Sequence, residues 1–155
     1  MGDLRSVLQG TIDTFLENNI LAVKRKDTSL FSVVLSEDCV RMYRPLSLIR
    51  RYPQFFKAEI KNADYEAQME IELQSMKDVS QKITRTVIDT TQRRATICSE
   101  QTVTTGDGES RDTIEVVWDL DFTEDGTRIS RILEFVDTYE STRLIEEMLS
   151  KVATK

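Results

Sequence analysis

The sequence has 155 residues, of which 39% are hydrophobic and 31% are charged, a composition typical of one globular domain with its own core. Its net charge of −6 argues against a nucleic-acid-binding surface and against binding to anionic membranes, because both require a basic surface. The chain contains no histidine, and this excludes serine triads, Cys–His pairs and the commonest zinc ligand.

The N-terminal part is predicted to hold two helices and a strand. Apolar residues recur at helical spacing over residues 4–16, and the Asn18-Asn19 pair is predicted to stop this helix. A shorter second helix is predicted over residues 20–35. The segment "DCVRMYRP", residues 38–45, alternates in hydrophobicity and predicts a strand that ends at its proline.

The middle of the sequence is less regular. Residues 46–62 mix basic and aromatic side chains around a proline, and they predict a loop or lid with a short helical piece. Tyr65, Met69 and Leu73 then follow at the spacing of one helix face, and Asn62 is a suitable N-cap. A third helix is therefore predicted from Asn62 onward.

The C-terminal half is rich in β-forming residues. From about Gln81 the composition turns to Thr, Val and Ile, and three turn signals, "DTTQRR", "TTGDGES" and "TEDGT", divide it into four segments. These segments predict a four-stranded antiparallel meander. An amphipathic helix with Leu144, Ile145 and Met148 on its apolar face closes the chain. The whole predicts an α+β fold in which helices and a bent sheet enclose a pocket.

The order of elements and two stretches resemble a known family. These stretches are "DCVRMYRP" and "VVWDLDFTEDGTRISRILEFVDTYESTRLIEEML", and they are similar to the SnoaL-like branch of the nuclear transport factor 2-like superfamily. The resemblance implies one SnoaL-like domain over residues 1–155, a cone-shaped curved antiparallel sheet packed on helices. The first strand is similar to that of small fungal isomerases and cyclases that rearrange terpenoid, polyketide or meroterpenoid-type intermediates. Such relatives need no metal or organic cofactor, and many are homodimers.

Two acids, Glu134 and Asp137, end the last predicted strand, and the strand register decides which one faces the pocket. A two-residue loop before this strand places Asp137 on the apolar face, whereas a three-residue loop with Gly126 left-handed places Glu134 there, opposite Val116. The alternative is that Asp137 caps the last helix while Glu134 is solvated. The resemblance implies a catalytic acid near this strand end.

Other candidate site residues carry weaker signals. Arg44 is predicted to bind a substrate carboxylate or carbonyl, and the resemblance matches it to the family's first-strand arginine; a surface position is the alternative. Glu100 is a candidate second acid, against the alternative of a solvated outer face. Tyr43, Tyr65 and Trp118 are predicted to line the cavity, although such aromatic residues more often belong to the core.

A carboxylate inside an apolar pocket is desolvated, which raises its pKa toward neutrality and lets it move protons at physiological pH. Together with the resemblance, this predicts a cofactor-independent isomerase or cyclase acting on a polycyclic terpenoid or polyketide intermediate in secondary metabolism. The alternatives are a non-catalytic ligand-binding or dimerisation module and a ketosteroid-isomerase-like enzyme. An enzyme is expected to hold at least two ionisable groups in its pocket, whereas a binding module is not.

The expected partners follow from the same reasoning. The ligand is predicted to be a small hydrophobic molecule, with no cofactor, no metal, no nucleic acid and no membrane. No apolar stretch long enough for a membrane span and no signal peptide is present, so a cytoplasmic protein is expected. A homodimer is predicted through the outer face of the sheet, for which the plausible residues are Val117, Thr113, Cys98 and Ile132.

Overall fold

The computed structural model describes residues 2–106 and 111–153. Its elements in chain order are α1 (Leu4–Arg25), the 3-10 helix η1 (Thr28–Ser32), β1 (Leu35–Arg44), α2 (Leu46–Arg51), β2 (Glu59–Lys61), α3 (Asn62–Glu72), β3 (Met76–Asp89), β4 (Arg94–Thr105), β5 (Arg111–Phe122), β6 (Ile129–Val136) and α4 (Thr138–Ala153).

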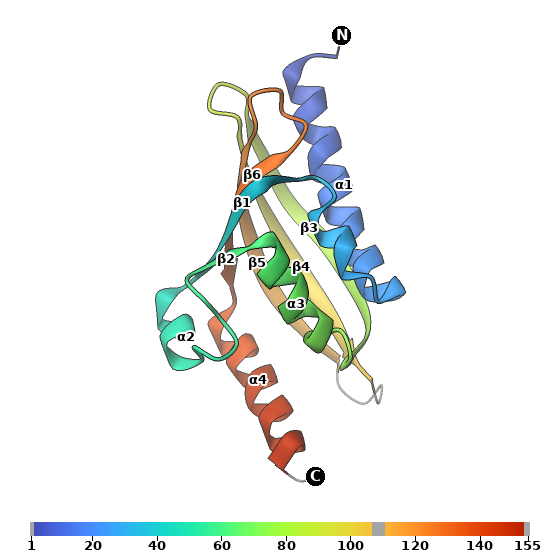
Figure 1. Ribbon diagram of the computed structural model, residues 1–155, viewed down its shortest axis with the longest axis vertical. Helices are drawn as coiled ribbons and strands as arrows, with labels where there is room; N and C mark the ends of the chain where they lie inside the picture. The colour runs from blue at the N-terminus through green and yellow to red at the C-terminus, as the bar shows by residue number, and fades with distance from the viewer. Residues whose placement is uncertain (1, 107–110, 154–155) are drawn as a thin grey trace.

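All six strands form one curved sheet in the order β2-β1-β6-β5-β4-β3. Helices α1 and α3 lie against the sheet, and α4 extends from its lower end (Figure 1). The predicted α+β class and the packing of helices on a curved sheet are confirmed. The sheet is mixed, however, because β1 runs parallel to β6 while the other neighbouring strands are antiparallel.

Helix α1 continues past the predicted stop at Asn18-Asn19, and the separate helix over residues 20–35 does not form. Asn18 is buried and lies in the middle of α1, so it does not end the helix. The helix ends at Lys26, which adopts a left-handed conformation with φ 54° and donates its backbone N–H to the last turn. The rest of the predicted second helix is η1 and the beginning of β1.

The predicted meander is confirmed as β3 to β6, although β3 begins at Met76 and not near Gln81. Residues 107–110 of the second predicted turn lie outside the described residues. The third turn is a loop over residues 123–128, in which Gly126 has φ 76°. The short helical piece predicted within residues 46–62 is α2, and the strand β2 follows it.

The two faces of the sheet differ in character. Alternate residues of β5, including Val116 and Trp118, are buried on the inner face, while Thr113 and Val117 point outward. Ile132 was predicted to lie on the outer face, and this is wrong: it is fully buried in the core on the inner face. Cys98 pairs with Val117 and shares its outward orientation, as predicted.

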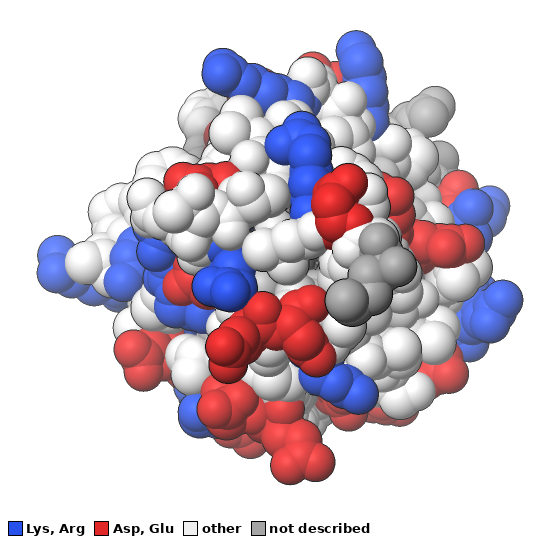
Figure 2. Space-filling view, turned by 90° about the horizontal axis from the view of Figure 1, so that it is seen from above, with Lys and Arg blue, Asp and Glu red and all other residues white. Residues whose placement is uncertain are grey.

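The charged residues form no continuous basic surface at the end of the molecule that Figure 2 shows. Acidic side chains form their largest group below the centre of this view and also lie at several other points, and basic side chains are spread around it in separate groups. Among the described residues, no helix is both long and apolar enough to cross a membrane.

Candidate functional site

A cavity of about 220 Å³ lies between the inner face of the sheet and helices α1, α3 and α4. Its walls are mainly apolar, and the aromatic side chains among them are Phe31, Tyr43, Phe55, Phe56, Tyr65 and Trp118. An apolar cavity with a few convergent polar groups is the usual setting for binding a small molecule. Tyr43, Tyr65 and Trp118, the aromatic residues predicted to line a cavity, all lie in the wall of this one.

The pairing of β5 with β6 turns Glu134 toward this cavity. Glu134 lies directly opposite Trp118, and paired residues of neighbouring strands point to the same face. The inward orientation is the one expected from a three-residue loop, but Glu134 was then predicted opposite Val116. The register differs because the pairing shifts between Asp121 and Phe122: Phe122 pairs with Ile129 beside the loop over residues 123–128, whereas Trp118 pairs with Glu134.

Glu134 forms an ion pair with Arg41, which points inward from β1. The Nη1 atom of Arg41 donates to Oε2 of Glu134 over 2.9 Å, and the Arg41 side chain is only 4% exposed. Its guanidinium carbon lies 3.7 Å from the centre of the Tyr65 ring. Burial acts to lower the pKa of Arg41, but Tyr65 and Glu134 together hold that pKa above its ordinary value. Arg41 therefore stays charged inside the cavity.

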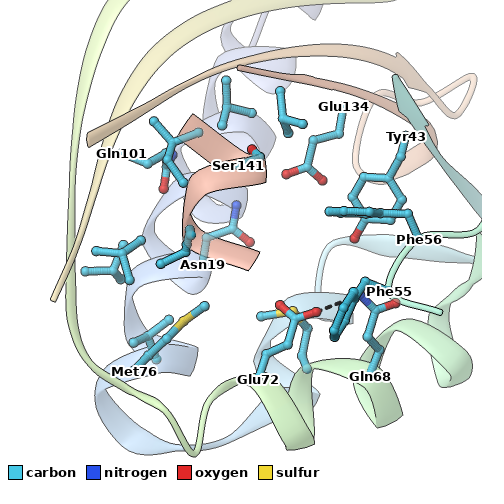
Figure 3. Close-up of a pocket in the computed structure, with 18 of the residues that line it drawn as sticks. Asn19, Tyr43, Phe55, Phe56, Gln68, Glu72, Met76, Gln101, Glu134 and Ser141 are labelled. Carbon is cyan, nitrogen blue, oxygen red and sulfur yellow. Dashed lines mark hydrogen bonds between the residues drawn. The ribbon is translucent and has the colours of Figure 1, made fainter. Parts of the chain in front are cut away.

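A second carboxyl group enters the cavity from the helical side. Glu72, the last residue of α3, accepts a hydrogen bond of 2.7 Å from Nε2 of Gln68. Figure 3 shows Glu72 and Glu134 extending into the cavity from different walls. Burial raises the pKa of Glu72, and the negative charge of Glu134 raises it further, while the hydrogen bond from Gln68 lowers it. The protonated form of Glu72 is thus favoured relative to an exposed glutamate.

We expect Glu72→Gln to raise the free energy of unfolding at pH 7. Because the folded protein holds the Glu72 proton more tightly than the unfolded chain, wild-type stability falls as the pH rises from the ordinary value of 4.5 through the raised pKa. Glutamine removes this titration and can keep the contact with Gln68. Urea unfolding between pH 4 and pH 8 measures the effect, with Glu70→Gln on the exposed side of α3 as control. Parallel pH profiles for wild type and Glu72→Gln would contradict it.

Two tyrosines complete the ionisable end of the cavity. Burial raises the pKa of Tyr43 and of Tyr65 well above the ordinary tyrosine value. Both hydroxyl groups therefore remain protonated near neutral pH and can donate hydrogen bonds. The Tyr43 ring packs edge-on against Phe56, with ring centres 5.2 Å apart, which fixes its position in the wall.

Three predicted site residues lie outside the cavity lining. Asp137 accepts hydrogen bonds from the backbone N–H groups of Tyr139 and Glu140, so it caps α4, as the structural alternative proposed. Glu100 lies on β4 beside Lys82, with 40% of its side chain exposed. Arg44 donates to the backbone oxygen of Tyr43. The structure thus brings together Glu134, Tyr43, Tyr65 and Trp118, without these three.

Arg41, Glu72 and Asn19 line the cavity but were not among the residues predicted for the site. Arg41 is two residues from Tyr43, and side chains at this spacing in a strand point to one face. Glu72 is seven residues after Tyr65, which is about two helical turns. Asn19 was interpreted as a helix stop, although it follows Phe15 by one turn. In each case the spacing of residues along the helix or strand indicated that the side chain lies on the inward face.

Several buried polar atoms around the cavity have no hydrogen-bond partner. They are Oδ1 of Asn19, Nη2 of Arg41 and Nε1 of Trp118. Buried polar groups in folded proteins are nearly always paired, so unpaired groups at a cavity require an explanation. These three groups are the unpaired polar atoms of an otherwise mainly apolar cavity wall.

Metal and thiol chemistry find little support in the described residues. Within residues 2–106 and 111–153, no group of three or more Cys, Asp or Glu side chains is arranged to hold a metal ion. Burial raises the pKa of the Cys39 thiol to about 11, so it is a protonated thiol at neutral pH and a poor nucleophile. The absence of a metal requirement stays a prediction.

A curved mixed sheet that wraps around a cavity, with helices closing its inner side, defines the nuclear transport factor 2-like fold. No model of a known protein family and no curated protein matches the sequence. Solved structures, in contrast, match over nearly the whole chain.

One match is the pinacolase BvnE from Penicillium brevicompactum, with a TM-score of 0.82 and 17% identity over 97% of this chain and 96% of that one. An NTF2-like protein of unknown function from Burkholderia pseudomallei has a TM-score of 0.66 and 17% identity, covering 90% and 97%. A putative SnoaL-like polyketide cyclase from Shewanella denitrificans has a TM-score of 0.66 and 11% identity, covering 91% and 98%. The chain therefore has the fold predicted from its sequence.

Proposed function

We propose that this protein is a cofactor-independent isomerase or cyclase that uses carboxylate general acid–base catalysis. The observation that carries the proposal is the presence of two carboxyl groups in different environments within one apolar cavity. Glu134 is paired with Arg41, while Glu72 is half-buried without a cation in contact among the described residues. Pairs of carboxyl groups whose environments differ in this way are suited to opposite roles in proton transfer.

Glu134 is the proposed base and Glu72 the proposed acid. Glu134 removes a proton from a carbon next to a carbonyl, and the electron pair of the broken C–H bond moves onto the carbonyl oxygen. Glu72 delivers its proton to another atom of the same intermediate, so the product is an isomer of the substrate. The two carboxyl groups then regain their original protonation states by exchange with solvent.

Arg41 and Tyr43 are the proposed stabilisers of the oxyanion that forms between these steps. Arg41 has an unpaired Nη2 group in the cavity wall, and the Tyr43 hydroxyl is held protonated by burial. Donors fixed in an apolar site stabilise a developing negative charge strongly, because they need no rearrangement when the charge appears. Arg41 thus takes the role that the sequence analysis assigned to Arg44.

A polycyclic terpenoid or polyketide intermediate of secondary metabolism is the proposed substrate. Aromatic and aliphatic walls suit a fused-ring hydrocarbon skeleton, and the acids and Arg41 suit an oxygen function on it. The fold similarity to a fungal pinacolase and to a putative polyketide cyclase supports this class.

A non-catalytic ligand-binding module remains the second candidate, because the Glu134 carboxylate is already satisfied by Arg41. The two candidates are separated by incubation in D₂O with a panel of polycyclic ketones, followed by mass spectrometry. An enzyme incorporates deuterium or yields an isomer, and Glu134→Gln abolishes this. Binding of a ketone without exchange or isomerisation would favour the module.

We also propose a homodimer through the outer face of the sheet. Phe135 is 48% exposed there and pairs with Val117, so isologous contact of two such faces would bury both side chains. Wild type is expected to scatter light as a dimer of 17.9 kDa chains, and Phe135→Glu is expected to shift it to monomer at micromolar concentration. Ser130→Glu is the control on the same strand. A monomeric wild type would refute this proposal.

A further inference from the structure

We infer that the site takes a ligand whose reacting polar head lies in the inner cavity while an apolar extension passes into a second, outer hollow beside α4. This inference rests on the proposed function and names the shape of its substrate. It concerns a binding subsite formed by the β3 and β4 ends and α4, away from the two carboxyl groups.

The outer hollow has a volume of about 180 Å³ and adjoins the inner cavity. Five of its seven lining residues also line the inner cavity, namely Ser75, Met76, Val103, Leu144 and Met148. The remaining two are Thr105 and Gly106 at the end of β4. The shared residues form the boundary across which one ligand contacts both spaces.

The size of the inner cavity makes such an extension necessary for a polycyclic ligand. A cavity of about 150 Å³ holds benzene, with about six non-hydrogen atoms, so at this ratio the 220 Å³ cavity holds about nine. A fused tricyclic skeleton has more atoms than this. The part of such a molecule that does not fit must leave the cavity, and the adjoining hollow offers mainly apolar side chains, those of Met76, Val103, Leu144 and Met148.

The side chains that line the two spaces indicate which end of the ligand lies in each. The ionisable groups Arg41, Glu72 and Glu134 all line the inner cavity, and none of them lines the outer hollow. At the boundary, Met76 and Met148 present flexible thioether side chains that adapt to ligands of different outline. The oxygen function therefore lies inside and the hydrocarbon portion outside.

Binding of 4-alkylcyclohexanones, from methyl to octyl, tests this inference by NMR with ¹³C-methyl methionine. Affinity is expected to rise roughly threefold to fourfold per methylene for every member of the series, since each added group leaves water. The longer members are expected to shift the Met76 and Met148 methyl signals, and Met42, which lines neither space, is the internal reference.

Gly106→Phe fills the outer hollow without touching the inner cavity. A Cβ at Gly106 meets only the Ser75 backbone oxygen at 3.6 Å, an ordinary contact, so the first atom of the new side chain is accommodated, and thermal melting checks that the variant folds. Gly10→Phe adds the same bulk on the exposed side of α1, where a Cβ meets nothing within 4 Å. We expect Gly106→Phe to remove the gain beyond the ethyl member, which for the six further methylenes of octyl is about 700-fold or more, and Gly10→Phe to keep it.

Affinity that stops rising at ethyl in wild type, or no binding by any member, would overturn the inference. An unchanged series in a folded Gly106→Phe would do the same. The proposed function is tested separately, because the binding series requires no turnover. Deuterium exchange that depends on Glu134, together with a flat series, would keep the function and reject the outer subsite.

Discussion

Replacing Glu134 with glutamine is expected to lower turnover at least about a hundredfold and leave the fold intact. General acid–base catalysis typically contributes a factor of about 10² to 10⁴, and an amide keeps the size of the side chain but cannot exchange the proton. The amide oxygen can still accept the hydrogen bond from Arg41, but the buried Arg41 charge loses its ion-pair partner, so a lower free energy of unfolding is expected in a variant that still folds. Turnover of an active ketone from the D₂O panel measures the loss, and thermal melting checks the fold.

Two variants make this result interpretable. Glu115→Gln changes an exposed glutamate on the neighbouring strand β5, and its turnover is expected to match wild type. Asp137→Asn tests the other acid of the predicted pair, and asparagine caps a helix about as well as aspartate, so stability is expected to change little. Equal losses of turnover in Glu134→Gln and Asp137→Asn would contradict the placement of Asp137 outside the site.

Replacing Arg41 with methionine is expected to lower the free energy of unfolding by about 3 to 5 kcal/mol. Removing one member of a buried ion pair leaves the other charge without compensation in a poorly solvated site. Arg41 is 4% exposed and Glu134 is 14% exposed, so neither charge is well hydrated. The midpoint of urea unfolding, with an unchanged slope, measures this loss.

The matched comparisons use the neighbouring strand and the partner residue. Arg131 pairs with Asp119 and Asp121 but is 30% exposed, so Arg131→Met is expected to cost about 1 kcal/mol or less. The double variant with Arg41→Met and Glu134→Gln is expected to regain part of the loss, because no buried charge is left unpaired. A single Arg41→Met variant as stable as Arg131→Met would show that the pair is effectively solvated.

The sequence predicted the meander well because its turn signals are local. Strong β formers between "DTTQRR" and "TEDGT" define β4 and β5, and only local chemistry is needed to read them. The parallel pairing of β1 with β6 could not be read in this way, because it joins residues about 90 positions apart. No turn connects these strands, so their relative direction depends on tertiary packing alone.

Predicted site residues lie in the cavity where the sequence pattern allowed one placement, and outside it where the pattern allowed two. Adjacent residues of a strand point to opposite faces, so once Tyr43 faces the cavity, Arg44 cannot, and Arg41 can. Arg44 was predicted without regard to this alternation of side chains along the strand. Glu134 was among the predicted residues, but its orientation depended on the shift in strand pairing beside the loop over residues 123–128, which sequence alone left open.

That loop also limits how the chain can change over evolutionary time. Gly126 is packed so closely on α1 that an added Cβ would lie 3.0 Å from a Leu8 methyl group, and its backbone oxygen accepts a hydrogen bond from Thr11. Point substitutions in the remaining exposed positions of the loop leave this contact unchanged. A deletion or insertion of a single residue that is passed on to the register of β6 would exchange the two sides of β6 and bring Phe135 to the cavity in place of Glu134. The chemistry of the protein is thus more sensitive to the length of this loop than to its composition.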